Sequence, residues 1–430
     1  MATVAPFCAL RYAPERVAVS RVVTQPYDKI SPEMQDRYYE ASPYNLVRII
    51  LGKRLRGDGD SENVYSRAAA SLQTWRQTGI LCPDPQPSLY TYSQTFAVPG
   101  TGARAERRGF IGLGRIEDYS AGIVFRHEQT LAKPKADRLD LLRATRAHFG
   151  QIFMLYSGSG EVDALLESPH APDIEVIDEY AVLHRVWKVS DPTVIRQVQE
   201  RMQGQKLIIA DGHHRYETAL AYRNERQAAA SPPAAPYDWV MMTFVDMNRH
   251  GLLILPTHRI VFGLPSFSAA RFQADARKFF GMEEVDASID AARAVSILRE
   301  AGHAGTALLA VAGDRAFLMH TPKERGTALF AGFSLRQQAL DVVQLHKCLL
   351  EGVFKISEEA IRNQKNVSYC READDGLALV RSGQAQVALL MNPVRIEQVR
   401  DIAFAGEVLP QKSTDFYPKL LSGLTIYALE

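Results

Sequence analysis

The sequence predicts a mixed α+β (α/β) fold in two domains, and three observations predict it. Apolar residues recur with period two in some segments and with period 3.6 in others, which is typical of helices packed on a sheet. The 430 residues exceed the roughly 100–200 residues of one domain. The pattern changes at the Phe262-Gly263-Leu264-Pro265 run, so we place the domains at 1–263 and 264–430.

In the predicted first domain, strand patterns and helix patterns follow one another. Residues 61–79 predict an amphipathic helix, because their apolar side chains recur at helical spacing. Residues 88–97 and 108–116 alternate as strands do and predict a hairpin. Further along we predict a helix at 137–149, strands at 151–156 and 206–210, a helix at 214–226, and strands at 239–245 and 252–255.

The predicted second domain begins with two helices and then a pair of strands at 307–312 and 315–320. Residues 338–354 and 395–405 are typical of helices, and 385–390 of a strand. We interpret His346, inside the first of these helices, as a structural residue.

Composition excludes several classes of protein. The net charge is +1, from 50 basic and 49 acidic residues, so nucleic acid is not an expected partner. We expect no membrane span, because no stretch approaches about 18 uninterrupted apolar residues, and no signal peptide. The four cysteines form no CxxC pair, which favours free thiols and a cytoplasmic location over a zinc ribbon.

The densest polar run, 211–215, connects the buried strand at 206–210 to the next helix. A helix N-terminus offers unpaired backbone N–H groups and the positive end of the helix dipole, which suit an anion. Gly212 permits a sharp turn and a close approach by a ligand. The planar fork of Arg215 is suited to phosphate. We therefore predict that this turn binds a phosphate-bearing ligand.

The other residues of the turn carry acid–base and metal chemistry. Asp211 could hold Mg²⁺, cap the helix or orient a histidine. His213 and His214 could donate hydrogen bonds, move protons or ligate a metal. A purely structural Asp-Gly turn with solvated histidines is the alternative. A zinc site is weaker, since HExxH spacing is absent, and neither GxxxxGK[ST] nor a GxGxxG fingerprint after a strand occurs.

Two further polar segments lie in the predicted first domain. His127 and Glu128 could supply a general base, and Lys133 and Lys135 could neutralise phosphate. Asp28 could place a carboxylate at a strand end. A solvated loop and a structural aspartate, respectively, are the alternatives.

Near the C-terminus, the run Leu409 to Thr414 is followed by Tyr417-Pro418-Lys419. Lys412, Ser413 and Thr414 could contact phosphate or a substrate carboxylate. The alternative is a polar loop folded onto the first domain. The pair His258-Arg259, which we place at a strand end, could face the same pocket as the 211–215 turn.

Several of these strings together resemble one family. They are ADGHHRYETAL, LRYAPERV, QPYDKIS, RHEQTLAKPKADRLDLLRATR and LPQKSTDFYPKLLSGL. The chain is similar, over nearly its whole length, to the bacterial and archaeal family known as domain of unknown function 1015 (DUF1015). Asp415 stands where an aromatic residue often follows Lys-Ser-Thr in that family. The family name implies no activity.

The DGHHR run by itself resembles the ParB/sulfiredoxin-like superfamily, which includes the archaeal free-serine kinases. This second resemblance implies a ParB/sulfiredoxin-like core with insertions, and a C-terminal α+β domain that could complete the pocket. It also implies nucleotide phosphates at the strand-to-helix turn, with ATP or ADP and Mg²⁺ as cofactors.

Three functions are compatible with these residues. The first is a phosphotransferase or nucleotide hydrolase, in which Gly212 and Arg215 hold phosphates, Asp211 assists Mg²⁺, and Glu128 or Asp28 is the base on a small hydroxyl-bearing substrate. The second is a non-catalytic nucleotide-binding regulator. The third is a metal-dependent hydrolase that uses His127, His213 and His214.

Overall fold

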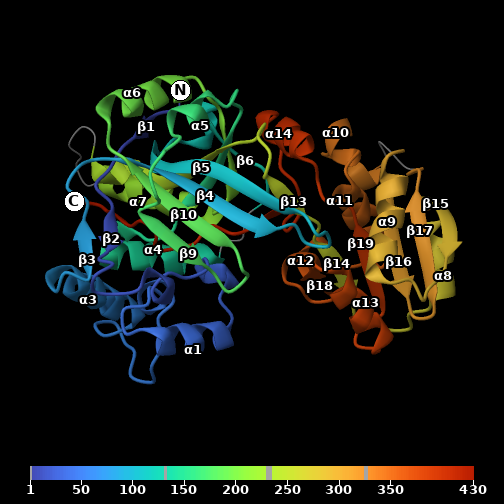
Figure 1. The fold of residues 1–430 in the computed structure, drawn as a ribbon. Helices are drawn as coiled ribbons and strands as arrows, with labels where there is room; N and C mark the ends of the chain where they lie inside the picture. Colours follow the sequence, from blue (N-terminus) through green and yellow to red (C-terminus); the bar gives the residue numbers. More distant parts are fainter. Residues whose placement is uncertain (1, 130–132, 229–234, 324–327) are drawn as a thin grey trace. The chain divides into compact units, whose positions relative to one another are not determined.

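A computed structural model describes residues 2–129, 133–228, 235–323 and 328–430 of the protein (Figure 1). The chain forms two compact units. Unit 1 contains Met1–Arg126, Thr130–Leu252 and Pro418–Glu430, and unit 2 contains His127–Gln129 and Leu253–Tyr417. The chain therefore passes into unit 2 at Leu253 and not at the predicted residue 263, and its last segment returns to unit 1. The pattern changes at 263 because β14 of unit 2 (His258–Val261) ends there. The unit to which this strand belongs is set by its partner strands, which lie more than 100 residues further along the chain and leave no mark in the local pattern.

Unit 1 is built on a mixed sheet of nine described strands, ordered β6-β11-β8-β12-β5-β4-β10-β9 with β1 beside β5. The β11–β6 and β12–β8 pairs are parallel, and the other pairs are antiparallel. The strands are β1 (Val4–Ala5), β4 (Leu89–Ala97), β5 (Arg104–Arg115), β6 (Val124–Arg126), β8 (Ile152–Tyr156), β9 (Ile174–Ile177), β10 (Leu183–Val189), β11 (Leu207–Asp211) and β12 (Trp239–Asp246). The predicted 88–97/108–116 hairpin is confirmed as β4–β5.

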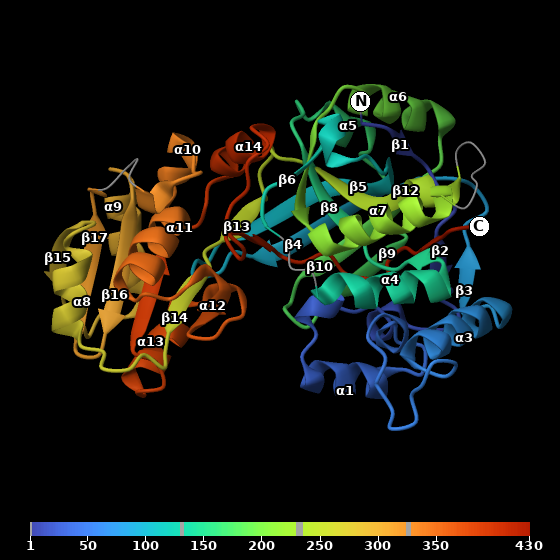
Figure 2. The ribbon, with the colours of Figure 1, turned by 180° about the vertical axis from the view of Figure 1, so that it is seen from behind.

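Helices of unit 1 bury their apolar sides against this sheet and against one another. The helices are α1 (Pro32–Ala41), α2 (Val47–Ile50), α3 (Val64–Gln77), α4 (Lys133–Thr145), α5 (Glu161–Leu165), α6 (Pro192–Met202) and α7 (His213–Ala228). Tyr216 and Ala219 of α7 enter the core formed by β8, β11 and β12. Figure 2 shows α4 beside α7, and the two helices are in contact. The sheet thus fixes the N-terminus of α7.

The C-terminal segment of unit 1 lies across the other parts of the unit. Ser422 and Thr24 form an antiparallel bridge, and β21 (Tyr427–Ala428) pairs with β7 (Ala147–His148). The helix predicted at 137–149 therefore ends earlier than expected. The reason is visible at Arg146, whose φ of 48° leaves the helical region.

Unit 2 is built on an antiparallel sheet of six described strands, ordered β15-β17-β16-β19-β14-β18. These are β14 (His258–Val261), β15 (Gly281–Val285), β16 (Ala307–Ala312), β17 (Arg315–His320), β18 (Val367–Cys370) and β19 (Val387–Met391), and β13 (Leu253–Leu255) pairs separately with β20 (Asp415–Tyr417). The mixed α/β class predicted from the sequence is confirmed.

Helices α8 (Ala269–Ala276), α9 (Ala291–Gly302), α13 (Ala373–Arg381) and α14 (Ile396–Phe404) accompany the sheet of unit 2. The helix predicted at 338–354 is interrupted. It consists of α10 (Leu335–Gln338), α11 (Asp341–Gln344) and a π-helical stretch, η6 (Leu345–Val353), and α12 (Glu358–Arg362) follows. The apolar period cannot distinguish these forms of helix. None of the described helices combines the length and apolar character that a membrane crossing requires.

Candidate functional site

The predicted turn joins a buried strand to a well-anchored helix. β11 is almost fully buried, and α7 begins directly after Gly212, which has a φ of +91°. The backbone N–H of Tyr216 donates to the carbonyl of Gly212 at 3.0 Å, so Gly212 is the first residue of the helical hydrogen-bond ladder. The hydroxyl of Tyr216 donates to the carbonyl of Glu117 at 2.7 Å and accepts from its N–H at 2.9 Å. The strand-turn-helix prediction is confirmed.

The side chain of Arg215 lies over this turn. Its Nη2 donates to Oδ2 of Asp211 at 3.1 Å, and its Nη1 donates to the carbonyl of Gln151. Only 15% of the Arg215 side chain is exposed. The guanidinium is therefore held at the helix N-terminus by two acceptors, Asp211 at the end of β11 and Gln151 directly before β8.

Cations surround Asp211. Nζ of Lys419 lies 3.8 Å from its Oδ1, and Arg215 faces its Oδ2. Burial raises the pKa of Asp211, but the charges of Lys419 and Arg215, with smaller contributions from Lys29 and His213, outweigh it and hold the pKa below the ordinary value. Asp211 is therefore ionised at neutral pH, inside an excess of positive charge that suits an anion.

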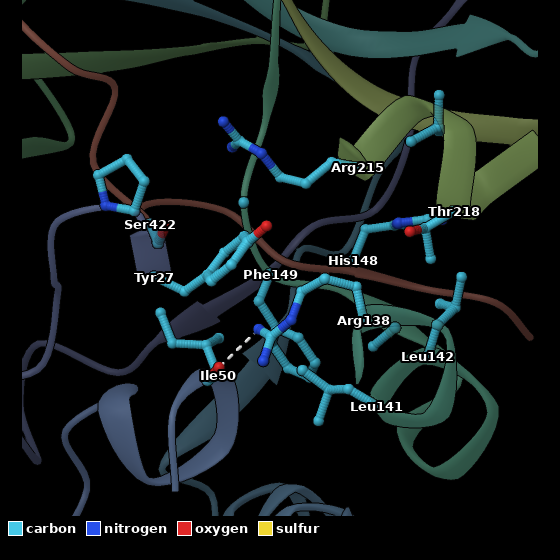
Figure 3. A pocket seen from close by; sticks show the side chains of 14 residues that line it. Tyr27, Ile50, Arg138, Leu141, Leu142, His148, Phe149, Arg215, Thr218 and Ser422 are labelled. Carbon is cyan, nitrogen blue, oxygen red and sulfur yellow. Dashed lines mark hydrogen bonds between the residues drawn. The ribbon is translucent and has the colours of Figure 1, made fainter. Parts of the chain in front are cut away.

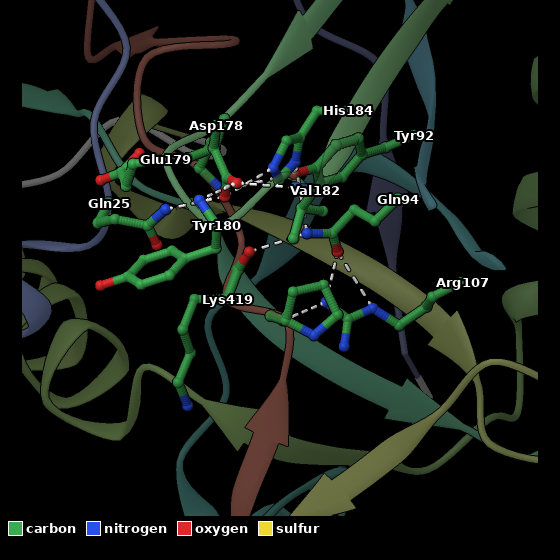
Figure 4. Close-up of polar contacts among 12 residues, drawn as sticks. Gln25, Tyr92, Gln94, Arg107, Asp178, Glu179, Tyr180, Val182, His184 and Lys419 are labelled. Atoms are coloured by element: carbon green, nitrogen blue, oxygen red, sulfur yellow. Dashed lines mark hydrogen bonds and ion pairs between the residues drawn. The ribbon is translucent and has the colours of Figure 1, made fainter. Parts of the chain in front are cut away.

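Lys419 is positioned through its backbone. Nε2 of Gln94 donates to the carbonyl of Lys419 at 2.8 Å, and Nη2 of Arg107 donates to the carbonyl of Pro418 at 2.5 Å. Arg107 also donates to Oε1 of Gln94 from Nε at 3.1 Å (Figure 4). Arg107 is 2% exposed, and burial lowers its pKa to about 10, so it still carries its charge at neutral pH. Two adjacent side chains of the β4–β5 hairpin thus fix two consecutive carbonyls of the C-terminal segment.

A buried acid–histidine pair supports this arrangement. Nε2 of His184 lies 3.1 Å from Oδ2 of Asp178, and its Nδ1 lies 2.7 Å from the hydroxyl of Tyr92 (Figure 4). Gln25 donates to the same Asp178 oxygen at 3.0 Å. Burial acts to raise the pKa of Asp178, yet hydrogen bonds led by that of His184 lower it below its ordinary value. The pair also positions the side chain of Gln94, whose Nε2 lies 3.4 Å from Nδ1 of His184.

A small cavity adjoins Arg215. Its volume is about 70 Å³, and Tyr27, Arg138, Phe149 and Thr218 are among the residues that line it (Figure 3). The guanidinium of Arg138 lies 4.2 Å from the centre of the Tyr27 ring, and Figure 3 shows this ring between Arg138 and Arg215. The cavity is therefore mostly apolar, with arginines at its wall.

Buried polar atoms near the turn have no hydrogen-bond partner among the described residues. Both side-chain atoms of Gln151, which is 0% exposed, are in this state, and so is Oγ1 of Thr218 on α7. A buried amide without partners costs roughly 1–3 kcal/mol in free energy of folding. Such groups are typical of ligand sites.

The other predicted residues of unit 1 lie in two places. Asp28 is exposed in the 3₁₀ turn η2 (Tyr27–Lys29). The charge of Lys29, in the same turn, helps to lower the pKa of Asp211. Lys133 and Lys135 are in the first turn of α4, and their side chains lie outside the described part of the chain.

Seven predicted residues belong to unit 2, and a single site that combines them with Asp211 stays a prediction. These are His127, Glu128, His258, Arg259, Lys412, Ser413 and Thr414. We predicted residues 127–129 to lie in the first domain, because a segment of three residues is too short to produce a recognisable apolar pattern of its own. In the structure Gln129 and His127 exchange backbone hydrogen bonds with Leu409, which joins this segment to unit 2.

Within unit 2 these residues form a compact polar group. Nε2 of His127 lies 2.7 Å from Oγ1 of Thr414, and the N–H of Lys412 donates to Glu128. Ser413 donates to the carbonyl of Pro410 at 2.5 Å. Burial raises the pKa of Glu128. Lys412, with a φ of 59°, is exposed. The group is linked by backbone and hydroxyl contacts, as in a folded polar loop.

The residues predicted for the metal-dependent hydrolase belong to both units. His213 and His214 belong to unit 1, whereas His127 belongs to unit 2. Among the described residues there is no group of three or more His, Cys, Asp or Glu side chains that could hold a metal ion.

Comparison with protein families gives a match to the model described as "Protein of unknown function (DUF1015)", over residues 4–343. The chain belongs to the DUF1015 family. The resemblance stated from its motifs is thereby confirmed. A comparison with curated proteins gave no match to this DUF1015 protein.

Solved structures similar to the DUF1015 chain have low identity. A conserved hypothetical protein from Pyrococcus furiosus is 13% identical, with 68% of this chain and 86% of that chain covered and a TM-score of 0.33. A free serine kinase in complex with AMP is 13% identical, with 68% and 83% covered and a TM-score of 0.35. A C-terminally truncated SbnI from Staphylococcus aureus is 11% identical, with 72% and 85% covered and a TM-score of 0.35.

The sequence did not identify Arg107, Gln94, Gln151 or Lys419 of the DUF1015 site. Lys419 lies in the C-terminal string that carries the family resemblance. The one sequence feature that could have pointed to it is its place in that string, directly after Pro418. Arg107 lies among other arginines in a turn-like stretch. Only the strand register shows that its side chain faces inward.

We expect Gly212→Ala to destabilise the DUF1015 turn and to move Arg215. A Cβ at Gly212 would lie 3.0 Å from both Nε and Nη2 of Arg215, and its φ of +91° disfavours any L side chain. The loss in free energy of unfolding should be about 1–2 kcal/mol, measured by urea titration. Gly204→Ala is the matched control, because Gly204 has a φ of +83° with open space around its Cβ. Equal phosphate binding by both variants would contradict the role of this contact.

Acid should destabilise the protein through a buried histidine of unit 2. His258 is 1% exposed, and burial lowers its pKa to about 4. Between this value and the unfolded value of about 6.5, the unfolded chain binds more protons, so stability is complete above that range and falls as pH decreases. We expect a loss of about 2 kcal/mol from this group at pH 5. Urea unfolding at pH 7 and 5 should show a smaller loss in His258→Gln, whereas exposed His303→Gln should behave as the wild type.

Proposed function

We propose that the 211–215 turn of unit 1 binds the phosphates of ATP or ADP, and that the protein transfers the terminal phosphoryl group to a small hydroxyl-bearing metabolite. The observation that carries this proposal is the arrangement of cations around one ionised carboxylate at the N-terminus of α7. Lys419 and Arg215 lie within 3.8 Å and 3.1 Å of Asp211, at the end of a 16-residue helix. A helix N-terminus with adjacent cations is a common phosphate site.

The size of the cavity beside Arg215 bears on which ligand part it takes. Its volume of about 70 Å³ is about half of the roughly 150 Å³ of a protein cavity that binds benzene. An adenine base needs more room, whereas a short hydroxyl-bearing group fits. We therefore assign this cavity to the acceptor end and the surface above Gly212 to the phosphates. A ParB/sulfiredoxin-like core in β11 and α7 is part of the same proposal.

Mg²⁺ fits this donor set only as a companion of the phosphates. The cation commonly binds one or two protein carboxylates, with substrate phosphates and water as its other ligands. Asp211 is the ionised carboxylate at the turn, and its oxygens face Lys419 and Arg215. When bound, the metal would neutralise charge on the transferring group.

The chain's own residues would then do two things, which are to hold the phosphates and to accept a proton. Arg215, Lys419 and the N-terminus of α7 would hold the phosphate oxygens. The acceptor oxygen would form its bond to the terminal phosphorus as the bridging P–O bond breaks, and its proton would pass to a base. Asp28 is the base that we propose within unit 1.

Calorimetry and ³¹P NMR on the full chain test the proposal. With Mg²⁺, we expect binding of ADP and ATP and transfer of phosphate to L-serine, the first acceptor to try. Asp211→Asn should remove the Mg²⁺ dependence of ADP binding, because it removes the proposed carboxylate ligand. Binding without transfer to any hydroxyl acceptor would select the non-catalytic regulator instead. Absence of both binding and transfer would overturn the proposal.

A further inference from the structure

Unit 2 contains a larger cavity that the proposed function does not use. Its volume is about 350 Å³, within the range of roughly 300–1,000 Å³ typical of small-molecule sites. Gln129, Pro410 and Gln411 line it, and they belong to the two family strings RHEQTL and LPQKST. Two segments that are distant in the sequence are thus brought to one cavity within this unit.

One wall of the cavity is the π-helical stretch η6. Such stretches are rare and are frequently found at functional sites. His346, on η6, is 6% exposed and lines the cavity. Nε of Arg259 donates to its Nε2 at 3.3 Å, and burial with the charge of Arg259 lowers the pKa of His346 well below its ordinary value. The imidazole is neutral, accepts at Nε2, and therefore carries its proton on Nδ1.

Charges of both signs line the same cavity in equal number. Lys347 and Glu351 form the inner pair at 2.8 Å, with side chains that are 15% and 24% exposed. Arg362 and Glu358 form an outer pair at 3.4 Å, with exposures of 54% and 59%. A ligand of one sign would meet repulsion as well as attraction here. A ligand that carries both signs can pair with Lys347 and Glu351 together.

Another part of the wall is apolar. Phe333, Val343 and Ile361 line the cavity, and Nζ of Lys347 lies 5.2 Å from the centre of the Phe333 ring. Apolar surface next to a charged pair matches a molecule that has a charged end and an apolar end.

We propose that this cavity binds a small zwitterion of the α-amino acid type with an apolar side chain. Its carboxylate would pair with Lys347, its ammonium group with Glu351, and its side chain would contact Phe333, Val343 and Ile361. The proposal does not depend on phosphate binding in unit 1.

Calorimetry on the full chain with L-leucine as the probe tests this assignment. We expect binding of leucine at millimolar concentration or below. Leucinamide, which lacks the carboxylate, and 4-methylpentanoate, which lacks the ammonium group, should each bind at least about tenfold more weakly. No binding of leucine, or equal binding of the three compounds, would overturn the proposal. This comparison requires no variant, so it does not depend on the folding of a mutant.

Variants localise the binding. Lys347→Met and Glu351→Gln should each weaken leucine binding about tenfold. Lys278→Met is the matched control, because Lys278 forms a similar 2.7 Å pair with Asp275 on α8, away from the cavity lining. Arg215→Ala should leave leucine binding unchanged. Unchanged binding in both cavity variants would also overturn the assignment.

Discussion

Arg215→Ala should reduce the affinity for ADP about a hundredfold, because it removes the guanidinium that the turn holds at the helix N-terminus. Truncation of a charged partner costs roughly 2–5 kcal/mol, and 1.4 kcal/mol corresponds to a factor of ten. Arg215→Lys should recover part of the loss, since it restores a charge without the planar fork. Calorimetry with ADP and Mg²⁺ measures the effect.

The same helix supplies the control for this variant. Arg226 is exposed on α7, with its guanidinium 6.0 Å from the centre of the Tyr237 ring. Arg226→Ala changes the net charge of the protein by the same amount and should leave ADP affinity unchanged. A similar loss in both variants would attribute the effect to overall charge, and would contradict a phosphate site at Arg215.

Arg107→Ala should have the largest effect on stability. The side chain is fully buried, donates to Gln94 and to the carbonyl of Pro418, and lies 4.6 Å from the centre of the Phe153 ring. Its removal leaves a cavity and two buried acceptors without their donor. We expect a loss of about 3 kcal/mol in free energy of unfolding, measured by urea titration.

A binding effect should accompany this loss. Without Arg107, the carbonyl of Pro418 is released, so Lys419 is less well held beside Asp211, and ADP affinity should decrease about tenfold. Arg108→Ala is the matched control. The Arg108 side chain is next to Arg107 in the sequence, is 52% exposed, and pairs with Glu106 at 3.2 Å. If Arg107→Ala proved as stable as Arg108→Ala, the stabilising role given to the contacts of Arg107 with Gln94 and Pro418 would be wrong.

The part of the site that is continuous in the sequence could be predicted from it. The turn at 211–215 has all its signals within a few residues: an apolar strand, a glycine and an immediate helix. Arg107 and Lys419 could not be predicted, because their proximity to Asp211 depends on the register of β4 with β5 and on the path of the C-terminal segment. Neither of these is recorded in a local pattern.

The fold shows the same division. The strands and helices with clear periodicity were predicted within a few residues, as for α3 and β12. The placement of His127 and Glu128 in unit 2 was not, since that depends on their pairing with Leu409. Apolar spacing also gave one helix at 338–354, where the hydrogen-bond pattern is interrupted and becomes π-helical.

The return of 418–430 to unit 1 has a consequence for synthesis. Domains generally fold from the N-terminus as the chain emerges from the ribosome. Asp211 and Arg215 emerge some 200 residues before Lys419, and all of Leu253–Tyr417 is made in the interval. Asp211 can therefore pair with Lys419 only after unit 2 has been translated. A nascent chain that stops before Lys419 contains the whole 211–215 turn but lacks this cation, so ligand binding reports that translation has passed Lys419.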